Sequence, residues 1–194
     1  EENVTGFEAT IAGAVYLDGR DGKCLDFEGS SYVTLPKEVF ASMDIENQVS
    51  VAFWCYGDEQ LQPQKDVIFE ASDVSGNLIY KITLPWDNGR VYWTTGDSTG
   101  TDMTFISVEP EDYMGRWNHW IFTKDSLSGH MKIFLNGSLL RNEGNRFKAL
   151  GAVETVKIGA DSSGSMNYDG MIDDFRIYRT ALSDVEVTTL FDSY

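Results

Sequence analysis

The feature that most constrains this chain is a series of short strand-type runs that follow one another with few interruptions. Each run alternates apolar and polar residues or is apolar throughout, as strands of a sheet do. The runs are KCLDF, SYVTL, QVSVAFWCY, DVIFEAS, LIYKITL, RVYWTT, MTFISV, NHWIFTK, HMKIFLNG, ETVKIG and IDDFRIY. Hairpin signals rich in Gly, Asn, Asp and Ser separate many of them, for example at 75–77, 87–89, 128–129 and 136–137. This pattern predicts an all-β fold, a two-sheet antiparallel β-sandwich.

Helices are expected to be few and short. Residues 37–43 predict one or two helical turns, and residues 182–191 predict a short C-terminal helix. Ser183 is the expected N-cap of that helix, and Glu186 three residues later completes a capping box. The sequence shows neither a linker nor a convincing repeat, so we expect a single domain over 1–194.

The charge of the chain excludes two classes of partner. A formal net charge of −16 repels nucleic-acid phosphates and anionic lipid surfaces. No apolar stretch approaches the ~20 residues of a membrane-spanning helix, so membrane insertion is not expected. The two cysteines, Cys24 and Cys55, match neither a disulfide scaffold nor a CxxC metal site. They either pair with each other or are free thiols.

Several of these runs together resemble a known family. GKCLDFEGSSYVTLP, VSVAFWCY, GRWNHWIFTKD, MKIFLNGSLL and GMIDDFRIYRTALSDVEV occur in this order. They resemble the laminin G-like (LamG) jelly rolls of the concanavalin A-like lectin/glucanase superfamily, over about residues 13–191. The resemblance implies two stacked antiparallel sheets, and it implies an extracellular, cell-surface or periplasmic location. Many such domains are non-catalytic modules that bind carbohydrate or protein, and many hold a calcium ion between their first and last strands.

Two adjacent carboxylates in the last run raise a question of burial. Asp173 and Asp174 are followed by Phe175 and Ile177. Strict alternation along a strand places Asp173 on the same face as these two apolar residues and turns Asp174 outward. Burying a carboxylate without partners is costly, so Asp173 needs compensation.

The family resemblance suggests calcium as that compensation. If the first and last strands are neighbours, Asp173 approaches Asp26, Glu28 and the backbone carbonyl of Gly29, which would form a cage of hard oxygen ligands. Glu28 stands where the family often has Asp. The alternative is an aspartate held by backbone N–H groups, a tryptophan N–H or an arginine such as Arg176.

Catalytic motifs are weak. No strand carries the ExDxE or ExDxxE spacing of the glucanases that share this architecture. Residues 96–100 spell GxSxG, but a strand follows where a nucleophile elbow requires a helix. His119 and His130 have no evident nucleophile or metal-ligand partner. We therefore expect no enzyme activity, unless folding brings together a carboxylate pair that the sequence hides.

Aromatic residues that cannot easily reach the core are the candidate ligand contacts. Trp86 lies beside a turn, Tyr92 shares the polar face of its run with Arg90, and Lys81 lies on the polar face of the neighbouring run. Tyr168 lies in a loop and is a further candidate. Such residues fit a glycan, and the acidic charge favours a neutral one, or an acidic one bridged by calcium. The alternative partner is an extracellular protein.

Overall fold

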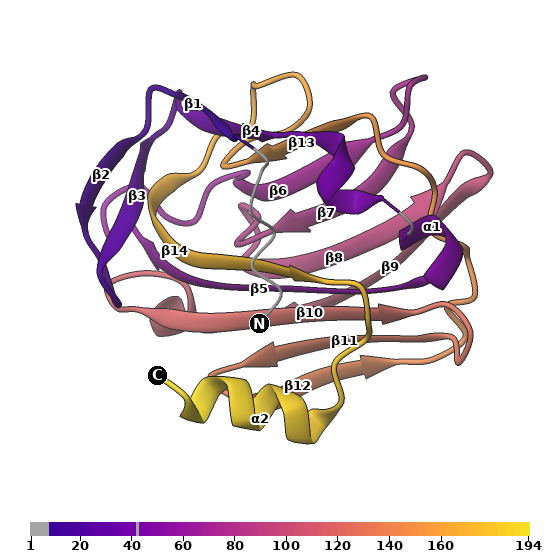
Figure 1. Cartoon of the computed structure of the whole chain (residues 1–194). Coiled ribbons are helices and arrows are strands. Elements are labelled where there is room, and N and C mark those ends of the chain that lie inside the picture. Colours follow the sequence, from indigo (N-terminus) through magenta and orange to yellow (C-terminus); the bar gives the residue numbers. More distant parts are fainter. Residues whose placement is uncertain (1–7, 42) are drawn as a thin grey trace.

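The computed structural model describes residues 8–41 and 43–194 and shows two antiparallel sheets of seven strands each, stacked face to face (Figure 1). In spatial order, the first sheet contains β1 (Thr10–Ala12), β4 (Tyr32–Leu35), β13 (Thr155–Ile158), β6 (Val67–Ser72), β7 (Leu78–Thr83), β8 (Arg90–Asp97) and β9 (Gly100–Ser107). The second contains β12 (Ser138–Glu143), β11 (His130–Leu135), β10 (Asn118–Asp125), β5 (Gln48–Gly57), β14 (Asp169–Tyr178), β3 (Lys23–Glu28) and β2 (Val15–Asp18). The predicted β-sandwich is confirmed.

Three strands that the sequence pattern did not indicate, β1, β2 and β12, are edge strands. All four residues of β2 are exposed, and most of β12 is exposed as well. A strand that buries neither face has no reason to alternate apolar and polar residues, so its pattern carries no strand signal.

Helices are short, as expected. The 3₁₀ turns η1 (Lys37–Phe40) and η2 (Pro110–Asp112), the helix α1 (Met43–Glu46) and the C-terminal helix α2 (Asp184–Asp192) complete the secondary structure of the described residues. Ser42, which belongs to the first predicted helical segment, lies outside the described residues. The Ser183 side chain accepts a hydrogen bond from the Glu186 N–H, and the Glu186 carboxylate accepts one from the Ser183 N–H, so the capping box is confirmed. None of the helices in residues 8–41 and 43–194 has the length and hydrophobicity needed to cross a bilayer.

The core lies between the sheets, and β8 illustrates how the sequence builds it. Val91 and Trp93 point inward and are fully buried, whereas Arg90 and Tyr92 point outward. Burying large apolar side chains contributes about 1.5–3 kcal/mol each, so this face holds the sheets together. Among the described residues, Cys24 and Cys55 are both buried free thiols.

A β-bulge in β14 changes the position predicted for Asp173. Asp173 lies opposite Trp54 of β5, on the outer face of the second sheet. Asp174 then adopts a left-handed conformation (φ 47°) and inserts an extra residue, after which Phe175 and Ile177 point into the core. The prediction that Asp173 shares a face with Phe175 and Ile177 is therefore wrong, because the bulge breaks the alternation on which it rests.

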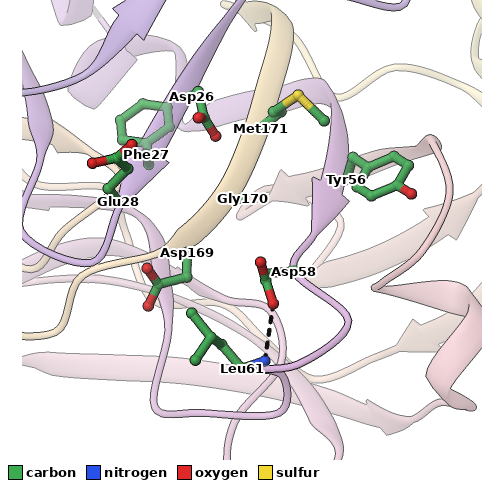
Figure 2. Close-up of a pocket in the computed structure, with 9 residues that line it drawn as sticks. All are labelled: Asp26, Phe27, Glu28, Tyr56, Asp58, Leu61, Asp169, Gly170 and Met171. Carbon is green, nitrogen blue, oxygen red and sulfur yellow. Dashed lines mark hydrogen bonds between the residues drawn. The ribbon is translucent and has the colours of Figure 1, made fainter.

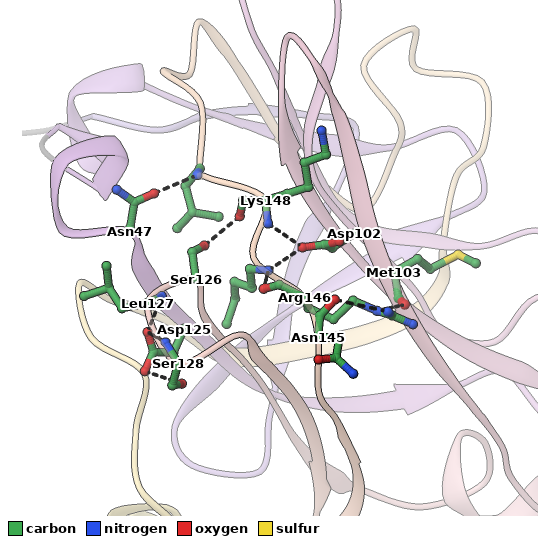
Figure 3. A network of polar contacts seen from close by, with 12 residues as sticks. Asn47, Asp102, Met103, Asp125, Ser126, Leu127, Ser128, Asn145, Arg146 and Lys148 are labelled. Atoms are coloured by element: carbon green, nitrogen blue, oxygen red, sulfur yellow. Dashed lines mark hydrogen bonds and ion pairs between the residues drawn. The ribbon is translucent and has the colours of Figure 1, made fainter.

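One end of the sandwich is closed by a buried ion pair. Lys124 at the end of β10 is inaccessible to solvent, and its ammonium lies 2.8 Å from the Asp102 carboxylate of β9 and also donates to the Arg146 carbonyl. The same Asp102 oxygen accepts the Lys148 N–H at 2.7 Å, and the Ser126 hydroxyl donates to the Lys148 carbonyl (Figure 3). Every charge in this network has a partner, so it ties the segment after β12 to both sheets.

Candidate functional site

The opposite end of β5 carries a cavity of about 360 Å³. It lies where β3, β5 and β14 run side by side, and the loop after β5 forms its rim (Figure 2). Its lining consists of Asp26, Phe27, Glu28, Tyr56, Asp58, Leu61, Asp169, Gly170 and Met171.

Strand register explains why these side chains converge. Asp169 pairs with Glu28, and Met171 pairs with both Asp26 and Tyr56, so β14 stands between two strands that present polar side chains on the same outer face. Directly opposite residues in a sheet share a face. The cavity is thus a consequence of how the last strand inserts between β3 and β5.

The loop after β5 positions the carboxylate of Asp58, which lines the cavity together with those of Asp26, Glu28 and Asp169. The Asp58 carboxylate accepts the N–H groups of Gln60 at 2.7 Å and Leu61 at 3.0 Å, which fixes the turn. The Asp58 N–H donates to the Asp169 carbonyl, so the loop is tied to β14. Beside it the Gln62 amide also donates to the Asp169 carbonyl at 3.1 Å.

The carboxylates of this cavity repel one another. Burial raises the pKa of Asp26, and the neighbouring charges of Glu28 and Asp58 raise it further. Burial and the charge of Asp58 likewise raise the pKa of Asp169. Among the described residues that line the cavity, none is basic. Such a site favours groups that donate hydrogen bonds or carry positive charge.

The buried carboxyl group of Asp66 supports the loop that forms the rim. Asp66 is 1% exposed and accepts a hydrogen bond from the Gln62 amide, which in turn reaches the Asp169 carbonyl. Burial raises the pKa of Asp66 to about 7. The arrangement connects the loop, Gln62 and β14 through hydrogen bonds, so the rim is positioned by more than its own turn.

An aromatic pair adjoins the carboxylates. Tyr56 lines the cavity, and Trp117 meets its ring edge-on with centroids 5.8 Å apart. Both rings are partly exposed. Sequence reasoning missed Tyr56, Trp117, Asp58 and Asp169. The available signals were that Tyr56 is the last outward residue of its strand and that both aspartates stand beside a strand end.

Four of the predicted ligand contacts lie on or beside the outer face of the first sheet. Tyr92 and Arg90 lie on β8, Lys81 on β7 and Trp86 in the turn between these strands. Lys81 forms a 2.7 Å ion pair with Glu70, and none of the four lines the cavity. The structure therefore groups them with one another but separates them from the carboxylates.

Tyr168 is not exposed, and its prediction as a surface aromatic is wrong. Its side chain is fully buried and meets the Phe27 ring edge-on at 6.4 Å. The reason is local, because the Tyr168 N–H donates to the Gly159 carbonyl at 2.9 Å. This bond folds the loop back and turns the ring into the core.

The structure does not assemble the predicted calcium ligands. Glu28 pairs with Asp169, and a strand rises about 3.3 Å per residue, so Asp173 lies on the order of 13 Å further along β14. Asp173 instead accepts the Asp21 N–H at 3.0 Å, as in the alternative that a backbone N–H holds it. Among the described residues, no three or more His, Cys, Asp or Glu side chains form a group that could hold a metal ion. The residues present therefore do not fit the predicted cage, and calcium binding remains a prediction without a site.

Comparison with known proteins places this fold. Residues 27–188 match the family model of the concanavalin A-like lectin/glucanases superfamily, named Laminin_G_3. The chain belongs to this family. A curated relative is Paraclostridial mosquitocidal protein 1 of Paraclostridium bifermentans, 23% identical over 94% of this chain. The chain spans only 15% of that protein.

Two solved structures are similar throughout. The binding domain of botulinum neurotoxin serotype G aligns with a TM-score of 0.77 at 20% identity, over 99% of this chain and 47% of that one, and shows the shared fold. Domain 4 of AbnA, a GH43 extracellular arabinanase from Geobacillus stearothermophilus, was solved in complex with arabinotriose. It aligns with a TM-score of 0.69 at 26% identity, over 94% of this chain and 87% of that one.

Proposed function

We propose that this domain is a non-catalytic carbohydrate-binding module of a secreted or cell-surface protein, and that its glycan binds in the cavity between β3, β5 and β14. The observation that carries this proposal is the combination of Tyr56 with Asp26, Asp58 and Asp169 in one cavity of about 360 Å³. The arabinotriose complex of the similar AbnA domain supports the ligand class.

The chemistry of the lining suits a polyhydroxylated ligand. A carboxylate accepts hydrogen bonds from sugar hydroxyls, and hydrogen bonds to a charged acceptor are roughly twice as strong as neutral ones. The Tyr56 ring, braced by Trp117, offers an apolar surface to the C–H face of a sugar ring. The acidic lining repels anionic glycans, so the expected ligand is neutral.

Titration against immobilised neutral and anionic polysaccharides tests the proposal. We expect binding to at least one neutral polysaccharide, weaker or no binding to anionic ones, and a loss of about tenfold in affinity for Asp169→Asn, which keeps the shape but removes the charge. Failure to bind any polysaccharide would contradict the proposal and favour an extracellular protein as the partner.

A second candidate function is glycan cleavage in the same cavity. The observation that favours it is that several carboxylates share one cavity, and that burial and neighbouring charges raise the pKa values of Asp26 and Asp169, as is required of the general acid of a glycosidase. Incubation with the polysaccharides that bind, followed by measurement of new reducing ends, separates the two functions. The binding module predicts none, whereas a glycosidase releases reducing ends that disappear in Asp26→Asn and Asp169→Asn.

A further inference from the structure

A second aromatic cluster lies on the outer face of the second sheet. Trp54 of β5 and His119 of β10 are paired across the strands, with ring centroids 4.9 Å apart. Phe191 of α2 packs against both rings, and Tyr194 contacts both, with its ring centroid 5.3 Å from each. The C-terminal residues thus cover a tryptophan and a histidine.

The covered side chains have unused hydrogen-bonding groups. Trp54 Nε1 and both ring nitrogens of His119 are buried with no hydrogen-bond partner in the described part of the chain. Trp54 is 5% exposed and His119 1% exposed. Buried polar atoms are normally paired in native proteins, so three orphaned atoms in one cluster require an explanation. Burial lowers the pKa of His119 to about 4, so at neutral pH its ring offers one donor and one acceptor.

The cluster adjoins the candidate glycan cavity. Trp54 and Tyr56 are alternate residues of β5, so they point to the same face and lie about 6–7 Å apart along the strand. In the pairing of β14 with β5, Asp173 lies opposite Trp54, and Met171 lies opposite Tyr56. The aromatic and acidic lining of the cavity therefore continues toward Trp54.

Of the two covering residues, Phe191 belongs to helix α2 and Tyr194 lies beyond its end. Helix α2 is anchored by Val187 and Leu190 on an apolar cluster of the second sheet. Tyr194 is held instead by its hydroxyl, which donates to Asp174, and by the Arg176 guanidinium 5.5 Å from its ring. The contacts that hold Tyr194 are therefore separate from the anchors of the helix, whereas Phe191 directly follows the anchoring Leu190.

We propose that Trp54 and His119 form a second sugar subsite, continuous with the Tyr56 cavity and covered in this structure by Phe191 and Tyr194, with the Arg20 guanidinium also 5.0 Å from the centroid of the Trp54 ring. When the cover opens, Trp54 Nε1 and the His119 ring nitrogens gain hydroxyl partners and the indole face receives a sugar ring. This inference rests on the proposed glycan binding, and it adds that the cover limits the length of glycan the wild-type protein accepts.

The experiment compares short and long glycans on an uncovered variant. Arabinotriose and arabinohexaose, with cellotriose and cellohexaose as a second pair, are titrated by calorimetry into the wild type and the double variant Phe191→Ala/Tyr194→Ala. We expect hexasaccharide affinity to rise about tenfold, or about 1.4 kcal/mol, while trisaccharide affinity changes little. Adding Trp54→Ala returns the hexasaccharide affinity to the wild-type value. Thr189→Ala, an exposed change on the same helix, is the matched control.

Two readouts make the result decisive. The NMR signals of the His119 ring shift when hexasaccharide binds the uncovered variant, which a purely structural role would not produce, and circular dichroism checks that the variant is folded. If the uncovered variant binds hexasaccharides no better than the wild type, while Tyr56→Ala abolishes binding in both, the second subsite is wrong and the proposed function stands. If neither protein binds any of the four glycans, the second subsite is overturned, and the titration against neutral and anionic polysaccharides decides the proposed function.

Discussion

The charged side chains at the two ends of β5 have opposite surroundings. At one end Lys124 is buried completely, yet its ammonium is matched by Asp102 and a carbonyl, and Asp102 accepts a backbone N–H as well. At the other end Asp26, Asp58 and Asp169 line a cavity whose described lining has no cation. One end uses charge to close the sandwich, and the other places several negative charges around an open space whose described lining has no basic residue.

This difference separates a structural from a functional use of charge. Burial lowers the pKa of Lys124, and its hydrogen bond to Asp102 opposes that change. At the cavity, burial and neighbouring charge act in the same direction and disfavour the ionised form of Asp26 and Asp169. Unfavourable ionisation of this kind is typical of residues that have a functional role in addition to their place in the fold.

The largest expected effect comes from breaking the closed end. Asp102→Ala leaves the Lys124 ammonium buried without its counter-charge, so we expect unfolding free energy to fall by about 3–5 kcal/mol. Chemical denaturation measures this. Asp102→Ala/Lys124→Met removes both charges and should recover part of the loss; a single variant within about 1 kcal/mol of the wild type would show that the pair does not close this end.

His119 represents a third case, a buried titratable group whose ring nitrogens have no hydrogen-bond partner among the described residues. Its pKa is lowered to about 4 by burial, with Asp174 and Arg176 as opposing nearby charges, against about 6.5 when unfolded. Stability is therefore full above pH 6.5 and falls as the pH drops toward 4, by up to about 3 kcal/mol.

Denaturation of the wild type and of His119→Phe across this range tests the effect, because the difference between them cancels other titrating groups such as Asp66. The stability of the wild type relative to His119→Phe should decline between pH 6.5 and pH 4. A difference that stays constant with pH would contradict a neutral buried histidine.

Smaller effects are expected at the cavity, where removing a charge should stabilise. Asp169→Asn relieves repulsion and should raise stability at pH 7 by about 0.5–1 kcal/mol. Because the folded pKa of Asp169 is raised, its ionisation opposes folding at neutral pH, and the gain should vanish below the unfolded pKa.

The matched control is Asp73→Asn. The Asn77 side-chain amide donates to the Asp73 carboxylate at 2.8 Å and lowers its pKa, and the N–H groups of Asn77 and Ser75 lower it further. This change should therefore lower the melting temperature. If both substitutions shifted the melting temperature in the same direction, the proposed contrast between a carboxylate repelled by its neighbours and one stabilised by hydrogen bonds would fail.

Most of the fold could be predicted because core strands show a clear alternation of apolar and polar residues. Runs such as that of Val91 and Trp93 alternate, since one face is buried. The capping box of Ser183 and Glu186 could also be predicted, because its two partners are only three residues apart in the sequence. Edge strand β2 buries nothing and gave no signal.

The site could not be predicted in the same way. The bulge at Asp174 depends on one residue's left-handed conformation, and it moved Asp173 to the other face. Tyr168 became buried through a backbone bond to Gly159, a residue nine positions earlier in the chain. The cavity itself joins β3, β5 and β14, whose residues meet only through register.

The central claim is that glycans bind at the acidic end of β5 and not on the outer face of the first sheet. Tyr56→Ala and Tyr92→Ala remove the same partly exposed side chain from these two places, so they form a matched pair. Affinity for the best-binding neutral polysaccharide should fall about tenfold or more for Tyr56→Ala, the typical loss of one well-packed aromatic contact, and stay unchanged for Tyr92→Ala. The reverse pattern would contradict this account and move the binding site to β8.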